Sequence, residues 1–431
     1  MTTLIHNCTA VLMDEARTVL KNAFVAVDGA VITSVGTVRP QGSFDREMDG
    51  GGNVLMPGFV NAHAHLPMTL MRGYGGGCDL HQWLQQYIFP AEAKLTDRAV
   101  HAAAALGLSE MIASGITTVA DMYDHCDAIA QEAAAAGVNA NIARGLNLFA
   151  PDFDPKKHQG CVETEELVEK WHGYNDGQIL IDACIHGEYT SRDVLWDWCA
   201  AFAKEHGLGM HVHLSETRSE HEECVARHGM TPAAVFERHG IFDVRAIAAH
   251  CVWTTPEDWE ILARHGVSAI HNPMSNLKLG SGIAPIPAMI KAGVNVCLGT
   301  DGVSSNNATD FFADMKLAAI LHNGASCDPM AMGPYEALRL ATVNGAKALG
   351  RNTGEIKAGC TADLILVDFT APNNIPCHDA VENLVYASHG GNVLMNMARG
   401  KVIYQNGEFL TIDMEKVRRE IDQYAMPLLF G

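Results

Sequence analysis

Two histidines, His63 and His65, lie one residue apart in the stretch GFVNAHAHLPMTLMRG, which reads as a buried strand that runs into a loop. Residues i and i+2 of a β-strand share a face, so these two side chains would aim two imidazole nitrogens at one point. Such a pair can bind a metal ion. Two solvated histidines in a turn are the default interpretation of an isolated His-x-His pair, so the rest of the chain has to decide.

Side chains that bind metals or move protons also end several later apolar runs. They are His186, His211, His213, Glu216, His250, His271 and Asp301. Each alone would be an ordinary core or surface side chain, but their recurrence at the ends of predicted strands indicates one shared site. His63, His65, one histidine of HVHLSE and Asp301 would supply three imidazoles and a carboxylate. That set suits a catalytic zinc or ferrous ion with one position left open for water.

His211 and His213 compete for the metal, because both lie on the same face of the strand in HVHLSE. His213 is nearer to the carboxyl end of that strand. We therefore expect His213 to reach the mouth of the site as a ligand and His211 to lie one layer deeper.

The remaining groups predict acid–base chemistry beside the metal. A divalent ion lowers the pKa of bound water to about 7. We expect Asp301 to take the proton of that water and Glu216 to protonate the leaving atom, while His250 orients or polarises the water. Binuclear sites usually need a bridging acidic ligand, often a carboxylated lysine on the fourth strand, and QILIDACIHGEY has no lysine. The sequence therefore predicts one divalent metal per subunit, and Zn²⁺, Fe²⁺ and Mn²⁺ are all compatible with these ligands.

These side chains need a scaffold that gathers strand ends. From about residue 55 onward, eight apolar runs alternate with helical segments such as DRAVHAAAALGLSEMIASG. This alternation predicts an α/β fold with a parallel sheet, and eight strands favour a (β/α)₈ TIM-type barrel, whose active sites lie at the carboxyl ends of the strands. No GxGxxG follows the first strand, which disfavours a doubly wound open sheet.

The two chain ends are rich in β-strand patterns and lack the helical spacers. FVAVDGAVITSVGT contains the hairpin signal Asp28-Gly29, and MARGKVIYQNGEFL contains Asn406-Gly407. We predict that residues 1–56 and 358–431 join into a small β-sandwich domain and that residues 57–357 form the barrel.

Composition limits the partners. The chain has 431 residues and a net charge of −20, with no run of Lys or Arg, so a nucleic-acid partner is disfavoured. The N-terminal stretch lacks a signal-peptide pattern, and no apolar run is long enough to cross a membrane. The twelve cysteines contain no CxxC pair, which suits reduced thiols in the cytoplasm. We expect a cytoplasmic enzyme that acts on a small molecule, and we also expect a homo-oligomer.

The motifs together resemble a known family. PGFVNAHAHLPMTLMRG, HVHLSET, AHCVW, HNPMSNLKLGSGIAP and LGTDGVSSNN look like the amidohydrolase superfamily, and within it the methylthioadenosine/S-adenosylhomocysteine deaminase group. The resemblance covers nearly the whole chain. It implies a mononuclear zinc site at His63, His65, His213 and Asp301, with Glu216 and His250 as acid–base partners. The implied reaction is hydrolytic deamination of the adenine ring of 5′-modified adenosines.

The resemblance also implies contacts with the substrate. Trp83 and Glu92, in LHQWLQQYIFPAE, would approach the nucleoside, with Glu92 on the ribose hydroxyls. Arg144 would hold a homocysteine carboxylate, and His186 would contact the purine or the sugar. A second Arg expected in the loop after the third strand is absent, since PDFDPKKH offers Lys156 and Lys157 instead. This departure leaves 5′-methylthio and 5′-deoxy adenosines open as substrates.

Two other functions compete with this one. The same site could remove an amine or halide from a guanine-like, pterin or triazine ring; Arg144 and Glu92 argue against this alternative. A non-catalytic structural relative would be expected to have lost metal ligands or acid–base groups. All six of those positions carry competent residues, which favours an enzyme.

Overall fold

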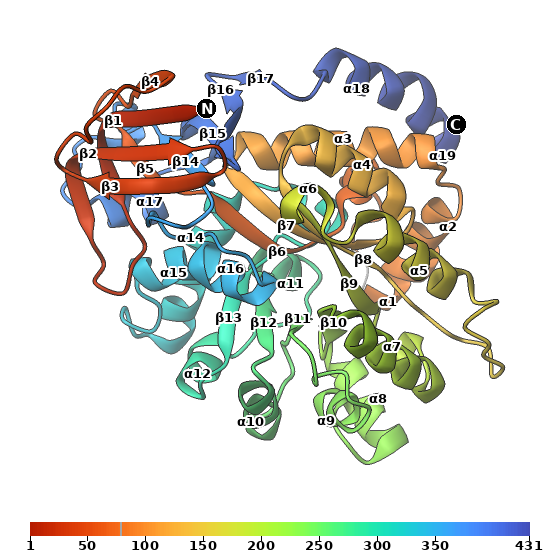
Figure 1. Cartoon of the computed structure of the whole chain (residues 1–431). Coiled ribbons are helices and arrows are strands. Elements are labelled where there is room, and N and C mark those ends of the chain that lie inside the picture. The colour runs from red at the N-terminus through yellow and green to blue at the C-terminus, as the bar shows by residue number, and fades with distance from the viewer. Residues whose placement is uncertain (78–79) are drawn as a thin grey trace.

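A computed structural model describes residues 1–77 and 80–431 of the chain. Eight parallel strands from the middle of the chain are hydrogen-bonded in chain order and curve into a barrel (Figure 1). They are β6 (Phe59–Ala64), β7 (Ile116–Tyr123), β8 (Asn139–Arg144), β9 (Ile179–Ile185), β10 (Met210–Leu214), β11 (Ala246–His250), β12 (Ser268–His271) and β13 (Asn295–Leu298). These strands are almost entirely buried, as expected of a parallel sheet covered by helices.

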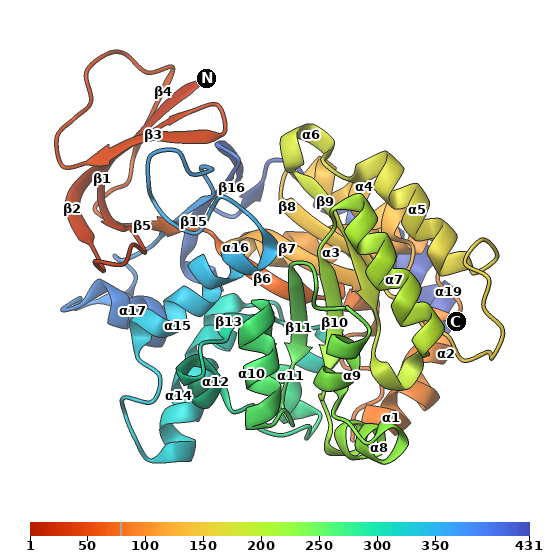
Figure 2. The ribbon, with the colours of Figure 1, turned by 60° about the horizontal axis from the view of Figure 1, so that its bottom comes forward.

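Helices connect the strands around the outside of the barrel (Figure 2). The longer ones are α3 (Asp97–Ala113), α4 (Cys126–Ala136), α5 (Gln159–Trp171), α7 (Asp193–His206), α8 (Arg218–His228), α9 (Pro232–Arg238), α10 (Pro256–His265), α14 (Phe311–Ser326), α15 (Pro334–Ala341) and α16 (Val343–Leu349). Local sequence fixes several of their ends. The Thr217 and Thr255 side chains accept hydrogen bonds from backbone N–H groups in the first turns of α8 and α10. Gly229 and Gly266 end the same helices in the left-handed conformation that glycine adopts easily.

The barrel is closed between its last and first strands by few contacts. Ala64 of β6 forms an isolated parallel bridge with Asp301, which follows β13. The Asp301 N–H donates to the His63 carbonyl at 3.0 Å, and the Asn61 side chain bonds to both the N–H and the hydroxyl of Thr300. The seam of the barrel therefore brings Asp301 beside the two histidines of β6.

Strands from both chain ends form a second, separate sheet. Its members are β1 (Thr2–Val11), β2 (Val19–Asp28), β3 (Val31–Gly36), β4 (Arg46–Asp49), β5 (Val54–Pro57), β14 (Leu364–Val367), β15 (Val393–Ala398), β16 (Lys401–Gln405) and β17 (Glu408–Phe409). The two ends meet where β5 pairs antiparallel with β14, Leu364 opposite Pro57. Side chains such as Ile5, Val25 and Met397 give this sheet a hydrophobic core of its own.

The C-terminal helices lie against the barrel. Figure 1 shows α18 (Met414–Glu420) and α19 (Met426–Phe430) beside α3. Arg98 of α3 pairs with Glu420 at 2.7 Å and stacks over the Tyr424 ring. The final segment thus contacts the barrel although its sequence neighbours belong to the end sheet.

The predicted (β/α)₈ barrel is confirmed, and so is the joining of both chain ends into a separate β-structure, which was predicted as a small β-sandwich. The end strands form one continuous sheet, and the exact division at residues 56/57 and 357/358 stays a prediction. None of the helices in the described ranges has the length and apolar character needed to cross a membrane.

Candidate metal centre and substrate cavity

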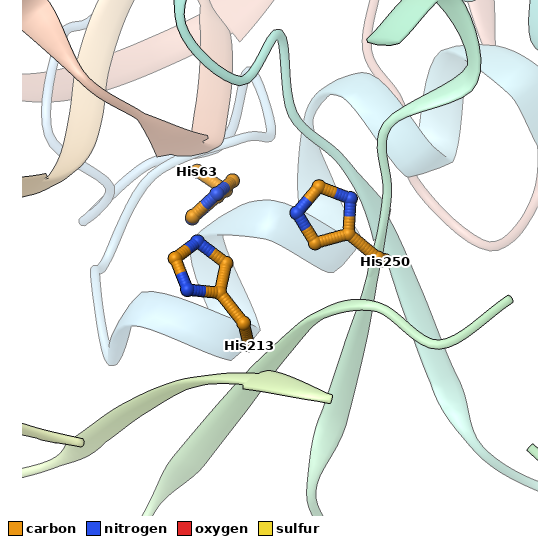
Figure 3. A group of neighbouring side chains, drawn as sticks. All are labelled: His63, His213 and His250. Carbon is orange, nitrogen blue, oxygen red and sulfur yellow. The ribbon is translucent and has the colours of Figure 1, made fainter. Parts of the chain in front are cut away.

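Four histidine rings converge at the carboxyl ends of the barrel strands. His63 lies in β6 and His65 directly follows that strand, while His213 lies in β10 and His250 ends β11. The His63 ring centroid lies 4.7 Å from that of His65, 4.9 Å from that of His213 and 5.5 Å from that of His250. Figure 3 shows the rings of His63, His213 and His250 turned toward one another from three different strands. The i, i+2 spacing thus directs the His63 and His65 rings to the same side at the end of β6.

Asp301 completes this group at the seam of the barrel. Its Oδ1 lies 3.1 Å from His65 Nε2 and 3.3 Å from His63 Nε2. Its Oδ2 accepts hydrogen bonds from the hydroxyls of Ser275 at 2.6 Å and Ser305 at 3.0 Å. Burial raises the pKa of Asp301, but the neighbouring His63 and His65 rings outweigh that effect and hold its pKa well below the usual range. Asp301 therefore presents one free, ionised oxygen to the histidines.

In His63, His65 and His213, the ring nitrogen that points away from the cluster is Nδ1. Each Nδ1 is fixed by a hydrogen bond to a group outside the cluster. His65 Nδ1 donates to the Met122 carbonyl at 2.5 Å, and His213 Nδ1 donates to the His186 carbonyl at 2.7 Å. His63 Nδ1 lies 2.8 Å from His211 Nε2, so His211 sits behind His63. Since carbonyls only accept, Nδ1 of His65 and His213 carries the hydrogen and Nε2 faces the cluster.

These side chains fit a divalent metal ion. His63 Nε2 is buried and finds no hydrogen-bond partner among the described residues. Burial lowers the pKa of His63 to about 3 and that of His213 well below its usual range, so both rings are neutral donors. The nitrogens of His63, His213 and His250 lie within 4.8 Å of one another, as do the ligand atoms of His63, His65 and Asp301. Neutral imidazoles with one carboxylate are a usual donor set for a divalent transition metal.

Glu216 lies beside His250, the histidine that ends β11. Glu216 Oε2 lies 3.7 Å from His250 Nε2, and Ser281 donates to Glu216 Oε1 at 3.3 Å. His250 Nδ1 lies 2.8 Å from Asn276 Oδ1, which accepts its hydrogen and turns Nε2 toward the cluster. Burial raises the pKa of Glu216, although His250 opposes this effect. A carboxyl with a raised pKa can hold a proton near neutral pH and release it to a substrate.

A cavity of about 360 Å³ adjoins this pair and the metal ligands. Three of the predicted substrate residues, Trp83, Glu92 and His186, line it together with His65, His213, Glu216, His250 and Asp301. Leu84 and Phe89 are among its apolar walls. The Tyr123 hydroxyl donates to Glu92 at 2.5 Å, and burial raises the Glu92 pKa. The cavity is therefore apolar along its sides and carries polar groups at a few fixed points, as small-molecule sites do.

Arg144 departs from the expectation. Its side chain pairs with Glu163 at 2.6 Å and with Asp124, and it lines a second cavity with Lys170 and other charged groups. Successive residues of a strand face opposite sides. Ala143 packs with Met122 toward the inside, so Arg144 points outward to α5. Lys156 and Lys157 line neither cavity. The structure thus gives no support for a carboxylate contact by Arg144.

Several residues that the sequence motifs did not single out support the site. They are Tyr123 on Glu92, Ser275 and Ser305 on Asp301, Asn276 on His250, and Asp121, which accepts the Leu66 N–H beside His65. Ser275 and Asn276 lie in HNPMSN, a stretch already noted, but their partners are distant in sequence. His271 is not in the cavity; it pairs instead with His322 at 3.3 Å.

Comparisons with known proteins show the family to which the chain belongs. Residues 54–403 match the Amidohydrolase family. A 5-methylthioadenosine/S-adenosylhomocysteine deaminase of Thermoanaerobacter pseudethanolicus is 37% identical over 100% of both chains. A 5′-deoxyadenosine deaminase of Methanosarcina mazei is 38% identical over 99% of this chain and 98% of the relative. The crystal structure of an adenosine deaminase from Xanthomonas campestris with bound zinc superposes with a TM-score of 0.94 at 32% identity, covering 99% of this chain and 98% of that one. The chain therefore belongs to the amidohydrolase family.

Proposed function

We propose that this protein is a zinc-dependent aminohydrolase that deaminates the adenine ring of 5′-modified adenosines. Its substrates would be 5′-methylthioadenosine, S-adenosylhomocysteine, 5′-deoxyadenosine and adenosine, and its products the inosine analogues and ammonia. The observation that carries the proposal is one cavity that holds the Glu216–His250 pair, the histidine–aspartate cluster and Glu92 together. The full-length relatives named for these nucleosides support the same choice.

In this proposal His63, His65, His213 and Asp301 would hold one zinc ion per subunit. When bound, the ion supplies Lewis acidity that lowers the pKa of water toward about 7. Asp301 accepts the proton that the water loses as its oxygen attacks C6 of the ring. His250 Nε2, which Asn276 turns toward the histidine–aspartate cluster, would hydrogen-bond to the attacking water and aim its oxygen.

Glu216 carries the second proton transfer. It donates a proton to a ring nitrogen as the oxygen adds, so that electron density from the broken C=N bond is neutralised. Asp301 returns the water's proton to the amino group, and ammonia leaves as the C6–N bond breaks. The new C6 hydroxyl then gives its proton back to Glu216 as the C6 carbonyl forms, which restores both carboxyl groups to their starting states. The net change adds one water and releases one ammonia. Burial of both carboxylates keeps bulk water away from these transfers.

The nucleoside would be held by the rest of the cavity. Glu92, fixed by Tyr123, would accept hydrogen bonds from the ribose hydroxyls, and Trp83 and His186 would pack against the base or sugar. Burial lowers the pKa of His186 to about 4, so this ring is neutral and offers hydrogen bonds without charge.

A turnover assay tests the proposal. Purified, zinc-replete protein is mixed with each of the four adenosines, and loss of adenine absorbance and release of ammonia are followed. Turnover of at least one adenosine is expected. Turnover of guanine, a pterin or a triazine, with none of the adenosines consumed, would contradict it and support the alternative ring substrates. Metal analysis of the active protein distinguishes zinc from iron and manganese.

The homo-oligomeric state and cytoplasmic location also remain proposals. Light scattering coupled to size-exclusion chromatography tests the first, and fractionation of the source cells tests the second. The acidic composition supports a small-molecule partner over a nucleic acid.

A further inference from the structure

The turn that carries Glu216 has an unusual backbone. It connects β10 to α8 through Ser215, Glu216 and Thr217, and Ser215 is held at a φ of 47°. A residue other than glycine in this left-handed region costs free energy and persists only where surrounding contacts enforce it. The conformation of this turn decides where the Glu216 carboxylate points.

One buried side chain holds both peptide N–H groups of this turn. The Glu220 carboxylate accepts the Ser215 N–H through Oε1 at 3.0 Å and the Glu216 N–H through Oε2 at 2.7 Å. Glu220 is only 6% exposed. These two bonds fix the peptide planes on either side of Ser215, the residue directly before Glu216, and each oxygen of Glu220 has a backbone partner.

Glu220 reaches the turn from the first turn of α8. Its own N–H donates to the Thr217 hydroxyl at 3.2 Å, which begins the helix. In an ordinary capping box, a glutamate at this third helical position would bond back to the N–H of the capping residue. Here the carboxylate extends past Thr217 to the two residues before it. The Thr217 hydroxyl therefore caps the helix, while the Glu220 carboxylate accepts the hydrogen bonds of the turn before it.

The other side of the turn is tied to the strand that carries His250. The Cys251 N–H donates to the Leu214 carbonyl at 3.0 Å, and the Trp253 N–H donates to the Ser215 carbonyl at 2.9 Å. These bonds place the main chain of the turn against the segment after β11. Removing the bonds from Glu220 would release the turn on one side only.

We infer that Glu220 is a positioning residue that aims Glu216 at the substrate cavity. Glu220 does not line that cavity, so it acts through Glu216. The inference rests on the proposed acid–base function of Glu216.

Substitution Glu220→Gln tests the inference, since the amide keeps one acceptor and places an NH₂ group against the second backbone N–H. We expect kcat to fall by about 10- to 100-fold, because a small misplacement of a reacting group costs this much. KM should stay within about threefold and zinc content unchanged, since substrate and metal contacts are intact. Glu223→Gln on the same helix, where the side chain is 68% exposed, is the matched control and should leave kcat unchanged.

A double-mutant cycle separates positioning from general loss of structure. If Glu220 acts only through Glu216, then Glu220→Gln has no further effect on kcat in a Glu216→Gln background. Losses that multiply in the double variant would overturn the inference. If the Glu220→Gln protein does not fold, Glu220→Asp takes its place. Aspartate keeps the charge but is one carbon too short to reach both N–H groups. As a single variant it must lower kcat, and in the Glu216→Gln background it must cause no further change in kcat.

Failure of the proposed function and failure of the inference about Glu220 give different results. The cycle is measured on whichever nitrogen heterocycle the wild-type protein hydrolyses, so another ring substrate overturns the proposed function and leaves the cycle interpretable. Turnover of an adenosine with multiplicative losses overturns only the role of Glu220. A zinc-replete protein that hydrolyses none of these rings overturns both.

Discussion

Single residues in this site each have a partner that limits what they can do. Glu216 faces His250, and Asp301 uses one oxygen for two serine hydroxyls and keeps the other for the histidines. The polar atoms are thus oriented before a substrate arrives, which is how enzymes reduce the cost of organising a reaction.

Replacing Glu216 with Gln removes the proposed proton donor while keeping the shape of the side chain. We expect kcat to fall by about 10²- to 10⁴-fold, the usual contribution of a general acid. Zinc content and the melting temperature should match the wild-type protein, because Glu216 is not among the proposed ligands. Steady-state kinetics with metal analysis makes the check, and full activity in this variant would show that the acid–base assignment is wrong.

Tyr123→Phe removes the hydroxyl that holds Glu92. KM for 5′-deoxyadenosine should rise about tenfold, since a hydrogen bond to a charged group is worth about 1.5–3 kcal/mol. A 2′,3′-dideoxy analogue serves as the control because it lacks the hydroxyls that Glu92 would bind. An equal rise in KM for both nucleosides would mean that Tyr123 supports the cavity in general and not the ribose contact.

Arg144→Met tests the outward orientation of that side chain. The ratio of kcat/KM for S-adenosylhomocysteine to kcat/KM for 5′-deoxyadenosine should change by less than about twofold, because Arg144 does not line the cavity. Both substrates are measured with the same preparation, so a loss of stability cancels in the ratio. A selective tenfold loss for S-adenosylhomocysteine, about 1.4 kcal/mol, would show that Arg144 does contact the carboxylate.

Elements of the barrel place the reacting groups through strained strand ends. Ser215, His250 and Asp301, which follow or end β10, β11 and β13, have positive φ angles of 47°, 73° and 61°. Such conformations cost about 1–3 kcal/mol each for residues other than glycine and collect at functional sites. Each of these strand ends therefore depends on the loop and helix behind it.

Behind Asp301, this support includes Asp314 on α14. Asn306 donates to Asp314 Oδ2 at 3.0 Å and to the Thr300 carbonyl at 2.9 Å, which ties α14 to the seam of the barrel. Burial raises the pKa of Asp314 to about 8, with the Asn306 hydrogen bond opposing it. Asp314 is therefore protonated in the folded state at pH values where the unfolded chain has already ionised it.

Asp314→Asn should make the protein more resistant to alkaline destabilisation. Because the folded-state pKa is raised, the contribution of Asp314 to stability is present at low pH and is lost as pH rises from its ordinary value of 3.8 through about 8. The free energy of unfolding of the variant minus that of wild type should rise across this window, by more than about 1.4 kcal/mol. Denaturant unfolding at several pH values measures it, and a pH-independent difference would contradict the expected protonation state.

Sequence periodicity predicts the parts of this site that lie on strands. His63 and His65 share a face because strands repeat every two residues, and the same rule places His211 one layer deeper than His213 on β10, where it contacts His63. It also assigns Arg144 and Ala143 to opposite faces of β8 but does not say which face is the inner one; in the structure the Arg144 side chain pairs with Glu163 of α5. Tyr123 and Asn276 could not be predicted, because packing of distant segments brings them to Glu92 and His250.

At the scale of the whole molecule, the candidate metal ligands come from parts of the barrel that share few backbone hydrogen bonds. His63 belongs to β6 and His65 follows it, His213 belongs to β10, and Asp301 lies across the seam from β6. A metal ion at this point would link three strands of the barrel at once.

Removal of the metal should therefore lower both activity and stability. A chelator is expected to abolish turnover and reduce the melting temperature, and added Zn²⁺ should restore both. A ligand at 100 times its Kd stabilises the folded state by about 2.7 kcal/mol. Differential scanning calorimetry measures the shift, with His63→Ala as the control that should no longer respond to the chelator. An unchanged melting temperature in protein shown to be metal-free would exclude this structural contribution.

The pairing of β5 with β14 has a consequence for how the chain folds. During synthesis β5 emerges early, yet its antiparallel partner at Leu364–Val367 follows the whole barrel. Contacts this far apart in sequence slow folding, and an unpaired strand edge can recruit other chains in the meantime. Until β14 is synthesised, the edge of β5 that pairs with it stays unpaired. We expect aggregation during expression to begin at this edge.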